Sequence, residues 1–363
     1  MRVLIIKLSA IGDVIHTLPA AAFLKRTLPD AHIAWAVERR AGAILQGSPV
    51  IDELIEIDTR ALRKNIFSNA TLASFRTQMG SLKGAGKSSG FDVAIDFQGL
   101  MKSGLVVKAA NAPRRIGFAT NELREKLSRF FLTEQVQTAS IRHVIEKNLA
   151  LARTVNDKPE SSAIAYEFPL AVSPEDEKYV DENVSNRIER FAILNPGGGW
   201  MTKLWSVEKF AKVADWLWDE YGIISLVTYG PGEENLVQAV QRNSRNNTAI
   251  PFPSTLKQFV VLARRAQIFV GGDTGPLHIA AACGTPITGI YGPTSPERNG
   301  PFNKHDVTVG RDLWCRDQCH QRKCWHWECM DIPITEVTQA IRIRLNKTQV
   351  EDRTSQQHFV FNV

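Results

Sequence analysis

Residues 271–293 read GGDTGPLHIAAACGTPITGIYGP and directly follow the apolar run QIFV at 267–270. The apolar run is typical of a buried strand, and LHIAAAC is typical of a short buried helix. Between them, Asp273 and Thr274 form a strand-to-helix turn whose unpaired N–H groups and helix dipole favour an anion. The stretch therefore predicts an α/β fold with a phosphate site, although the same residues also suit an ordinary capped helix start.

Strand-like and helical segments alternate along the chain, which is typical of doubly wound parallel sheets. The predicted strands are Val3–Ile6, His32–Val37, Leu54–Ile57, Val93–Phe97 and Arg115–Phe118 in the first half, and Ala192–Leu194, Ile224–Thr228, Gln267–Val270 and Thr288–Tyr291 in the second. Three prolines and a shift to polar residues at 158–177 indicate a domain boundary near 160–185. We therefore predict two Rossmann-like domains, 1–165 and 185–330, and a C-terminal helix and tail at 331–363 that pack back toward the first domain.

The first predicted strand leads into KLSAIGDVIHTLPA, which starts with Lys7. Lys7, Ser9 and Asp13 follow the strand at the edge where open α/β sheets bind ligands. Taken singly, Asp13 is an ordinary capping residue and Lys7 a solvated charge. A dinucleotide oxidoreductase carries G-x-G-x-x-G at this place, whereas KLSAIGD has one glycine, which argues against that class of enzyme.

These two stretches together resemble a known family. GDTGPLHIAAACGTP with the later YGPTSPERNGPF, and the opening MRVLIIKLSAIGDVIHTLPA, are similar to motifs of the family 9 glycosyltransferases, the lipopolysaccharide heptosyltransferases, and most of all to the heptosyltransferase I group. The resemblance implies a glycosyltransferase-B architecture, in which two Rossmann-like domains face each other across a cleft. It also implies an inverting transfer of heptose from ADP-heptose to the Kdo region of the lipopolysaccharide inner core.

The second domain is expected to bind the donor. The glycines of NPGGGWMTKLW at 195–205 let backbone approach a ligand, and Lys203 supplies a charge suited to phosphate, although a mobile loop with a solvated lysine has the same composition. YGPGEEN at 229–235 offers carboxylates to ribose hydroxyls, or simply an acidic first helical turn. Similarity to the family favours Glu234 over Glu233. The predicted donor-binding residues are Gly198, Gly199, Lys203, Glu234, Asp273, Thr274, Gly275 and His278.

The first domain is expected to bind the acceptor. DTRALRKNIF at 58–67 clusters three basic residues, and arginine makes the bidentate contacts that carboxylates and phosphates favour. Such a loop is also an ordinary solvated surface, but this one resembles the acceptor-binding loop of the family, as do segments further along the chain. The predicted acceptor-binding residues are Lys7, Ser9, Arg60, Arg63, Lys64, Gln98, Lys102, Arg124 and Lys147.

Glycosyl transfer needs a base that takes a proton from the acceptor hydroxyl and positive charge that stabilises the leaving nucleoside diphosphate. We assign the base to Asp13 and the charge to Lys203, assisted by the N–H groups of Thr274 and Gly275. The predicted loops contain no acidic DxD-type metal pair. We therefore predict a single-displacement transfer that has Asp13 and Lys203 as catalytic residues and requires no cofactor.

Composition sets the class of partner. A net charge of +6 and a pI near 9.1 favour an anionic partner. The basic runs and aromatic motifs of nucleic-acid-binding proteins are missing, so we expect an anionic small molecule or a lipid head group instead. The sequence has no apolar stretch of about 18 residues and no secretory signal. We therefore expect a cytoplasmic protein. The resemblance to the family further implies ADP-heptose as the donor, Kdo-lipid A or a related precursor as the acceptor, and a place at the inner face of the cytoplasmic membrane.

Four cysteines near the C-terminus follow the pattern C-x3-C-x4-C-x4-C. They are Cys315, Cys319, Cys324 and Cys329, with His320 and His326 between them. A structural metal, reduced thiols and disulfides are all compatible with this pattern, although a cytoplasmic chain disfavours disulfides. The spacing departs from the usual C-x2-C pair of metal sites. Because disulfides are disfavoured, the four cysteines are nevertheless a candidate structural metal site.

Two alternatives to the leading interpretation stay open. In the first, the chain is a family 9 transferase with the same mechanism that acts on another acceptor, either heptosylated core or a protein. In the second, it is a sugar-nucleotide-binding protein that has lost catalysis. The presence of both Asp13 and Lys203 favours an enzyme over this second alternative.

Overall fold

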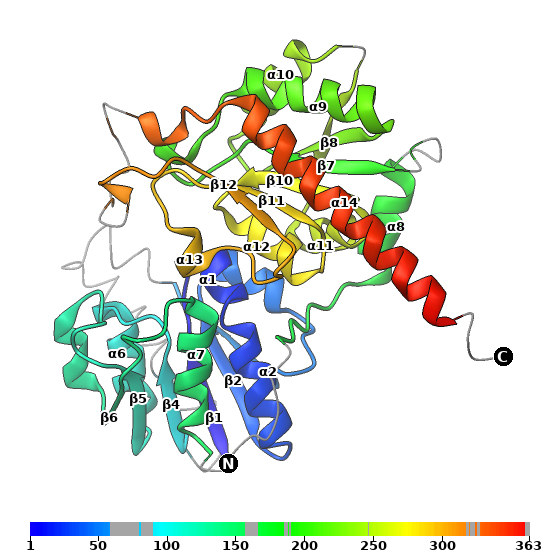
Figure 1. Ribbon diagram of the computed structural model, residues 1–363. Helices are drawn as coiled ribbons and strands as arrows, with labels where there is room; N and C mark the ends of the chain where they lie inside the picture. Colours follow the sequence, from blue (N-terminus) through cyan, green and yellow to red (C-terminus); the bar gives the residue numbers. More distant parts are fainter. Residues whose placement is uncertain are drawn as a thin grey trace. The chain divides into compact units, whose positions relative to one another are not determined.

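The chain folds into two compact units, each built on one parallel sheet (Figure 1). The computed structural model describes residues 1–58, 80, 90–156, 166–184, 188, 190–245, 247–316, 319, 324 and 327–359, with side chains as far as 348. The units are Met1–Ala171 and Val172–Val363. Their division falls inside the range 160–185 in which the prolines and polar residues suggested a boundary.

The sheet of the first unit has the order β3-β2-β1-β4-β5-β6, with every neighbouring pair parallel. Its strands are β1 (Arg2–Ile6), β2 (His32–Val37), β3 (Glu53–Glu56), β4 (Val93–Asp96), β5 (Arg114–Phe118) and β6 (Glu134–Val136). The strand order reverses between β1 and β4. The loops that follow these two strands therefore lie side by side at the carboxyl edge, where open sheets bind ligands.

Nearly continuous apolar runs form the centre of this sheet. RVLII of β1 and HIAWAV of β2 are buried along almost their whole length, as parallel strands covered on both faces must be. Trp35 is fully buried, and its indole N–H donates to the Lys7 carbonyl at 3.2 Å. The helices described in this unit are α1 (Ile11–Ile15), α2 (Leu18–Thr27), α3 (Arg39–Gly42), η1 (Ala43–Leu45), α6 (Met101–Ala110), η2 (Lys126–Phe131) and α7 (Val144–Arg153).

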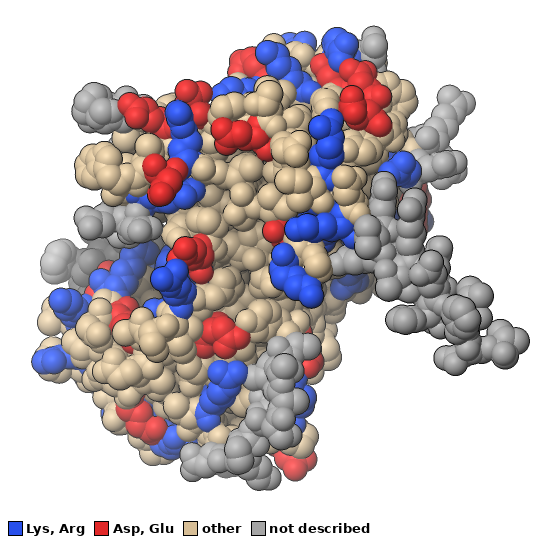
Figure 2. Space-filling model, in the orientation of Figure 1, with Lys and Arg blue, Asp and Glu red and all other residues tan. Residues whose placement is uncertain are grey.

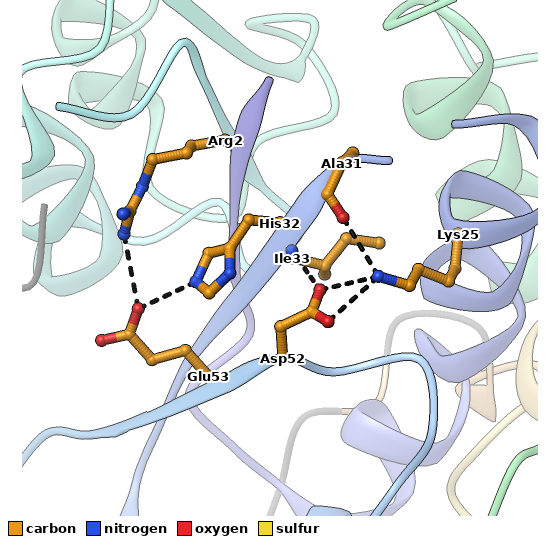
Figure 3. Close-up of polar contacts among 7 residues, drawn as sticks. All are labelled: Arg2, Lys25, Ala31, His32, Ile33, Asp52 and Glu53. Carbon is orange, nitrogen blue, oxygen red and sulfur yellow. Dashed lines mark hydrogen bonds and ion pairs between the residues drawn. The ribbon is translucent and has the colours of Figure 1, made fainter. Parts of the chain in front are cut away.

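Polar contacts fix the opposite, amino-terminal edge of this sheet (Figure 3). The Asp52 carboxylate accepts from the Ile33 N–H at 2.8 Å and from the Lys25 ammonium at 2.9 and 3.0 Å. Beside it, Glu53 Oε2 lies 3.1 Å from His32 Nε2. These contacts join the starts of β2 and β3 to the last turn of α2.

Removing the charge of Asp52 is expected to destabilise the first unit at neutral pH. Partial burial is the largest single influence and acts to raise the pKa of Asp52, but the Ile33 hydrogen bond and Lys25 together outweigh it and lower the pKa. A carboxyl group with a depressed folded pKa stabilises the fold above its unfolded pKa, about 3.9. That stabilisation is lost as the pH falls through the folded pKa.

Asp52→Asn should therefore lower the calorimetric melting temperature of the first unit at pH 7, by an amount equivalent to about 1 kcal/mol. At pH 3 the difference from the wild type should be smaller. Asp30→Asn, at an exposed turn before β2, is the control and should leave both melting temperatures unchanged. An Asp52→Asn shift of the same size at both pH values would contradict this account.

The sheet of the second unit has the order β12-β11-β10-β7-β8-β9 and is also parallel throughout. Its strands are β7 (Phe191–Asn195), β8 (Ile224–Tyr229), β9 (Ala249–Pro253), β10 (Ile268–Gly272), β11 (Ile287–Ile290) and β12 (Val307–Val309). Here the order reverses between β7 and β10, so the segments after these strands adjoin at the carboxyl edge. Those segments are NPGGGW and DTGPLH.

The long C-terminal helix packs on this second sheet. The helices described in the second unit are α8 (Pro174–Asn183), η3 (Met201–Lys203), α9 (Val207–Tyr221), α10 (Glu234–Asn243), α11 (Leu256–Arg265), α12 (Gly275–Ala282), α13 (Pro296–Asn299), η5 (Glu328–Met330) and α14 (Ile334–Phe359). α14 contacts α9, β10, β11 and β12. A buried ion pair of Arg344 with Asp306, at 2.8 Å, fixes it there. The return of this tail toward the first domain stays a prediction.

Basic and acidic side chains lie interspersed among uncharged residues on the face drawn in Figure 2. Among the described helices, none combines the length and apolar character that crossing a membrane requires.

Candidate functional site

One buried amide connects three strand ends of the second sheet. Asn195 is the last residue of β7, and its amide nitrogen lies 3.0 Å from the Thr228 carbonyl and 3.2 Å from the Thr228 hydroxyl, near the end of β8. The Thr274 hydroxyl, which follows β10, lies 3.5 Å from Asn195 Oδ1. Because β7 is between β8 and β10, Asn195 fixes the relative positions of the loops after these strands.

Asp273, immediately after β10, is the centre of the site in this unit. Its carboxylate lies 2.7 Å from the Lys203 ammonium, 3.0 Å from His278 Nε2 and 2.7 Å from the Asn299 amide nitrogen. Burial is the largest single influence and acts to raise the pKa of Asp273, but His278 and Lys203 outweigh it and hold the pKa well below its usual range. Asp273 is therefore an anion that orients both neighbouring side chains.

Lys203 is fixed in place and retains one donor for a ligand. Its ammonium donates to the Asp273 carbonyl at 2.9 Å and to Asp273 Oδ2 at 2.7 Å. An ammonium group has three N–H bonds. No described nitrogen or oxygen accepts the third, and the Trp200 ring centroid lies 5.0 Å from the ammonium. The first turn of α12 adds the N–H groups of Gly275 and Leu277, which a helix start leaves unsatisfied. These donors together suit an anionic ligand beside Asp273.

Glu233 joins the two loops that were predicted to bind the donor. Its Oε1 accepts from the Gly198 N–H at 2.9 Å, and its Oε2 accepts from the Gly230 N–H at 2.8 Å. A Cβ atom on Gly197 would lie 2.2 Å from Glu233 Oε2, so a side chain there would displace the Glu233 carboxylate from this position. Glu233 therefore holds NPGGGW against YGPGEEN.

Glu234, the predicted ribose ligand, has a different environment. It begins α10, is exposed, and accepts from the Gly232 N–H at 3.3 Å. Gly199, on the neighbouring loop, is exposed and has open space where a Cβ atom would be. Ribose binding by Glu234 and donor binding by Gly199 stay predictions.

Glu233→Gln should weaken donor binding more than it slows turnover. The amide of glutamine has one oxygen, so one of the two N–H groups that Glu233 now satisfies loses its acceptor. Loss of one charge-assisted hydrogen bond, about 1.5 kcal/mol, corresponds to a rise of about tenfold in the donor KM. The kcat should fall less, because Glu233 shapes the loop without being assigned to the reacting atoms. Initial rates against donor concentration measure both constants.

Glu234→Gln is the matched control, because it makes the same change at the next, exposed position. We expect a smaller rise in KM for this variant. A larger effect at Glu234 than at Glu233 would show that a direct ligand contact of Glu234 outweighs the loop contact of Glu233.

Asp96 builds the loop after β4 in the first unit. Its carboxylate accepts from the N–H groups of Gln98 at 2.9 Å and Gly99 at 3.1 Å and from the Ser103 hydroxyl at 2.9 Å. Complete burial is the largest influence on Asp96 and raises its pKa, against these hydrogen bonds and the positive charge of Lys7. Asp96 therefore stabilises the turn on which Gln98 is carried.

Two predicted acceptor residues connect this turn to the loop after β1. Gln98 Oε1 accepts from the N–H groups of Leu8 at 3.1 Å and Ser9 at 3.3 Å. Lys102 forms an ion pair with Glu38 at 2.7 Å, and its ammonium lies 3.5 Å from the Ser9 hydroxyl. The structure thus brings Ser9, Gln98 and Lys102 together where the strand order reverses.

Asp13 lies in α1, the short helix that follows β1 and the loop of Ser9. It is partly buried, and its Oδ2 accepts from the Ala10 N–H at 3.2 Å. No described residue is hydrogen-bonded to its Oδ1, which leaves that oxygen for a substrate hydroxyl. Lys7 is 5% exposed and donates to the Phe97 carbonyl at 2.7 Å, so it supports the β4 loop from within. An acceptor contact of Lys7 stays a prediction.

The other predicted acceptor residues have separate surroundings. Lys147, on α7, forms an ion pair with Glu122 at 3.0 Å. Arg124 is exposed just before η2. Arg60, Arg63 and Lys64 lie outside the described residues. Their contacts with an acceptor stay predictions.

The four cysteines of the cluster, Cys315, Cys319, Cys324 and Cys329, are reduced thiols in this structure. Cys283 is also a free thiol. Burial and then the thiols of Cys319, Cys324 and Cys315 raise the pKa of Cys329. Within the described part of the chain, no three metal-ligating side chains have the arrangement of a metal site. The two histidines of this segment lie outside that part. The structural metal stays a prediction.

Comparison with known proteins decides the family. Residues 79–326 match the model of glycosyltransferase family 9 (heptosyltransferase). This chain belongs to that family. It is 27% identical over 326 residues to lipopolysaccharide heptosyltransferase 1 of Pseudomonas aeruginosa, covering 89% of this chain and 87% of that protein. It is 28% identical over 312 residues to lipopolysaccharide heptosyltransferase 1 of Escherichia coli K12, covering 85% and 92% respectively.

A solved structure supports the same fold. E. coli heptosyltransferase WaaC with ADP superimposes with a TM-score of 0.72 at 24% sequence identity, covering 94% of this chain and 99% of that one. The family and the fold class predicted from sequence, two Rossmann-like domains of the glycosyltransferase-B type, are confirmed. The chain is a glycosyltransferase.

Several residues that shape the site escaped sequence analysis. Asn195 gave a usable signal, because a polar residue that ends an apolar strand is suited to hold neighbouring strand ends. Glu233 was passed over because similarity to the family favoured Glu234. Asn299 and Glu38 gave no local signal, since their partners lie in segments far along the chain.

Proposed function

We propose that this family 9 enzyme transfers heptose from ADP-heptose to the Kdo region of the lipopolysaccharide inner core, with inversion and without a metal ion. The observation that carries the proposal is the ammonium of Lys203, held by Asp273 beside the start of α12. Two relatives named lipopolysaccharide heptosyltransferase 1 and a structural neighbour that binds ADP support the choice of donor and product.

In the proposed reaction, the donor diphosphate binds Lys203 and the N–H groups of Thr274 and Gly275. Asp13 accepts the proton of the acceptor hydroxyl, whose oxygen forms a bond to the anomeric carbon while the bond from that carbon to ADP breaks. A single displacement inverts the configuration at the anomeric carbon. The negative charge that develops on ADP is stabilised by a positioned ammonium and a helix dipole.

The acceptor assignment rests on the first unit. Ser9 of the loop after β1 contacts Gln98 and Lys102, and Asp13 accepts from the N–H of the next residue, Ala10. The basic residues predicted in this unit suit an anionic sugar. We further propose that the enzyme acts in the cytoplasm, peripherally at the inner membrane, because a lipid-linked acceptor is anchored there.

An acceptor assay tests the proposal. The purified chain is incubated with ADP-heptose and either Kdo-lipid A or an acceptor that already carries one heptose, and the products are weighed by mass spectrometry. We expect the mass of one heptose to be added to Kdo-lipid A alone. Addition to the heptosylated acceptor alone would assign a different family 9 specificity. Addition to neither, with ADP-heptose binding retained, would support a non-catalytic binding protein.

EDTA should leave transfer largely unchanged, because Lys203 and the start of α12 supply the positive charge of the donor site. Elemental analysis of the same sample tests the cysteine cluster separately. Near-stoichiometric metal, with Cys319→Ser/Cys324→Ser lowering the melting temperature more than turnover per folded molecule, would establish a structural metal. Activity that vanishes with EDTA and returns with a divalent ion would refute the metal-independent mechanism.

A further inference from the structure

An exposed apolar and basic surface lies on η2 and the neighbouring helix α6. Three of the nine large hydrophobic side chains that are exposed among the described residues lie here, at 39% for Leu105, 63% for Leu127 and 68% for Phe130. Basic residues on the same two helices are exposed as well. We call this the η2 surface, formed by Leu105, Lys108, Lys126, Leu127, Arg129 and Phe130.

The 3₁₀ geometry of η2 sorts its side chains into three rows. In a 3₁₀ helix, residues three apart lie one above the other. Leu127 and Phe130 therefore form an apolar outer row, and Lys126 and Arg129 form a basic outer row beside it. The third row points inward, where Ser128 is fully buried. The Arg129 guanidinium also lies 4.6 Å from the Phe130 ring centroid, so the two outer rows are in contact.

η2 is held firmly although its outer rows are exposed. Phe131, the second residue of the inner row, packs on α6 at Gly104, where a Cβ atom would lie 2.3 Å from the ring. Glu125, just before η2, accepts from the Met101 N–H at 2.6 Å, and its own N–H donates to the Gly99 carbonyl at 3.2 Å. The exposure of Leu127 and Phe130 is therefore a property of a fixed surface.

The η2 surface is next to the residues predicted to bind the acceptor. The Glu125 contact attaches the start of η2 to Gly99, which directly follows Gln98. Arg124 precedes η2 in the chain, and Lys102 is on α6. A partner bound to the η2 surface would consequently lie near the acceptor loops of the same unit.

We propose that the η2 surface adsorbs to the surface of an anionic lipid bilayer. Leucine and phenylalanine insert at the level of the head groups, while lysine and arginine beside them reach the lipid phosphates. Glu125, which directly precedes Lys126 in the chain, directs its carboxylate to the Met101 N–H. Lysine is depleted at protein–protein interfaces, whereas Lys108 and Lys126 are both part of the η2 surface, so its composition favours an anionic lipid surface over a protein partner.

The proposal rests on the proposed function only for the benefit it gives, namely access to a lipid-linked acceptor. Vesicle binding by the purified full-length chain tests it directly. We expect flotation with vesicles of phosphatidylglycerol and phosphatidylethanolamine, less with phosphatidylcholine alone, and a decrease with added salt. Leu127→Ser/Phe130→Ser should lower the vesicle partition coefficient about tenfold or more, and Lys126→Gln/Arg129→Gln should lower it by about tenfold.

Trp218→Ser/Ile343→Ser is the matched control, because these side chains, at 44% and 39%, are exposed on the other unit. It should bind vesicles as the wild type does. Transfer to a deacylated, water-soluble Kdo acceptor should be unchanged in the η2 variants, whereas transfer to vesicle-embedded acceptor should fall with vesicle binding. If no acceptor receives heptose, the proposed function fails but the vesicle result still stands.

Two results would overturn the membrane proposal. The first is that folded Leu127→Ser/Phe130→Ser binds vesicles as strongly as the wild type does. If the double variant does not fold, the same result for Phe130→Ser has the same meaning. The other is a change in oligomeric state by light scattering without a change in vesicle binding, which would make the η2 surface an interface between copies of the chain.

Discussion

Asp13→Asn is expected to reduce turnover by about 10²- to 10⁴-fold while donor affinity stays near that of the wild type. The substitution preserves local structure, because the asparagine carbonyl oxygen still accepts from the Ala10 N–H that Asp13 Oδ2 now binds. It removes the negative charge that takes the acceptor proton. Initial rates with saturating ADP-heptose measure turnover, and calorimetric titration with ADP measures donor affinity.

Asp52→Asn is the control, because it makes the same chemical change at the opposite, amino-terminal edge of the same sheet. It should lower stability and leave the turnover of folded enzyme unchanged. Near-normal turnover in Asp13→Asn would remove the base assignment. Donor affinity that falls together with turnover would instead place Asp13 at the donor.

The sequence predicted every central strand and one edge strand, β3, whereas it missed the other three edge strands. All nine predicted strands form, to within a residue or two at their ends. The three missed strands, β6, β9 and β12, each pair on one side only. Their sequences, EQV, AIPFP and VTV, are short, polar or interrupted by proline. Central parallel strands need continuous apolar runs, whereas edge strands tolerate these features, so periodicity does not reveal them.

The site was predictable in position but only partly in its contacts. Strand-end motifs correctly placed Lys203 and Asp273 together, although 70 residues separate them. The sequence also suggested that Lys203 simply faces the donor, whereas the structure shows that Asp273 takes two of its three N–H bonds. Contacts such as Glu233 with Gly198, across 35 residues, depend on how two loops fold over the sheet. No local pattern in either loop encodes them.

The second large effect is expected for Lys203→Ala. The loss of a positioned donor to developing charge typically lowers kcat by about 10²- to 10³-fold, and ADP affinity should fall by about tenfold or more because a charge-assisted hydrogen bond to phosphate disappears.

The effect of Lys203→Ala should exceed that of deleting a surface charge, since the Lys203 side chain is only 16% exposed and the substitution also leaves buried Asp273 without its cationic partner. Lys212→Ala, at an exposed position of α9, is the matched control and should change neither ADP affinity nor kcat. Because Asp273 keeps its contacts with His278 and Asn299, the variant should still fold, which calorimetry checks. Unchanged ADP affinity in folded Lys203→Ala would mean that the ammonium serves only to neutralise Asp273. The start of α12 alone would then have to stabilise the charge on the leaving diphosphate.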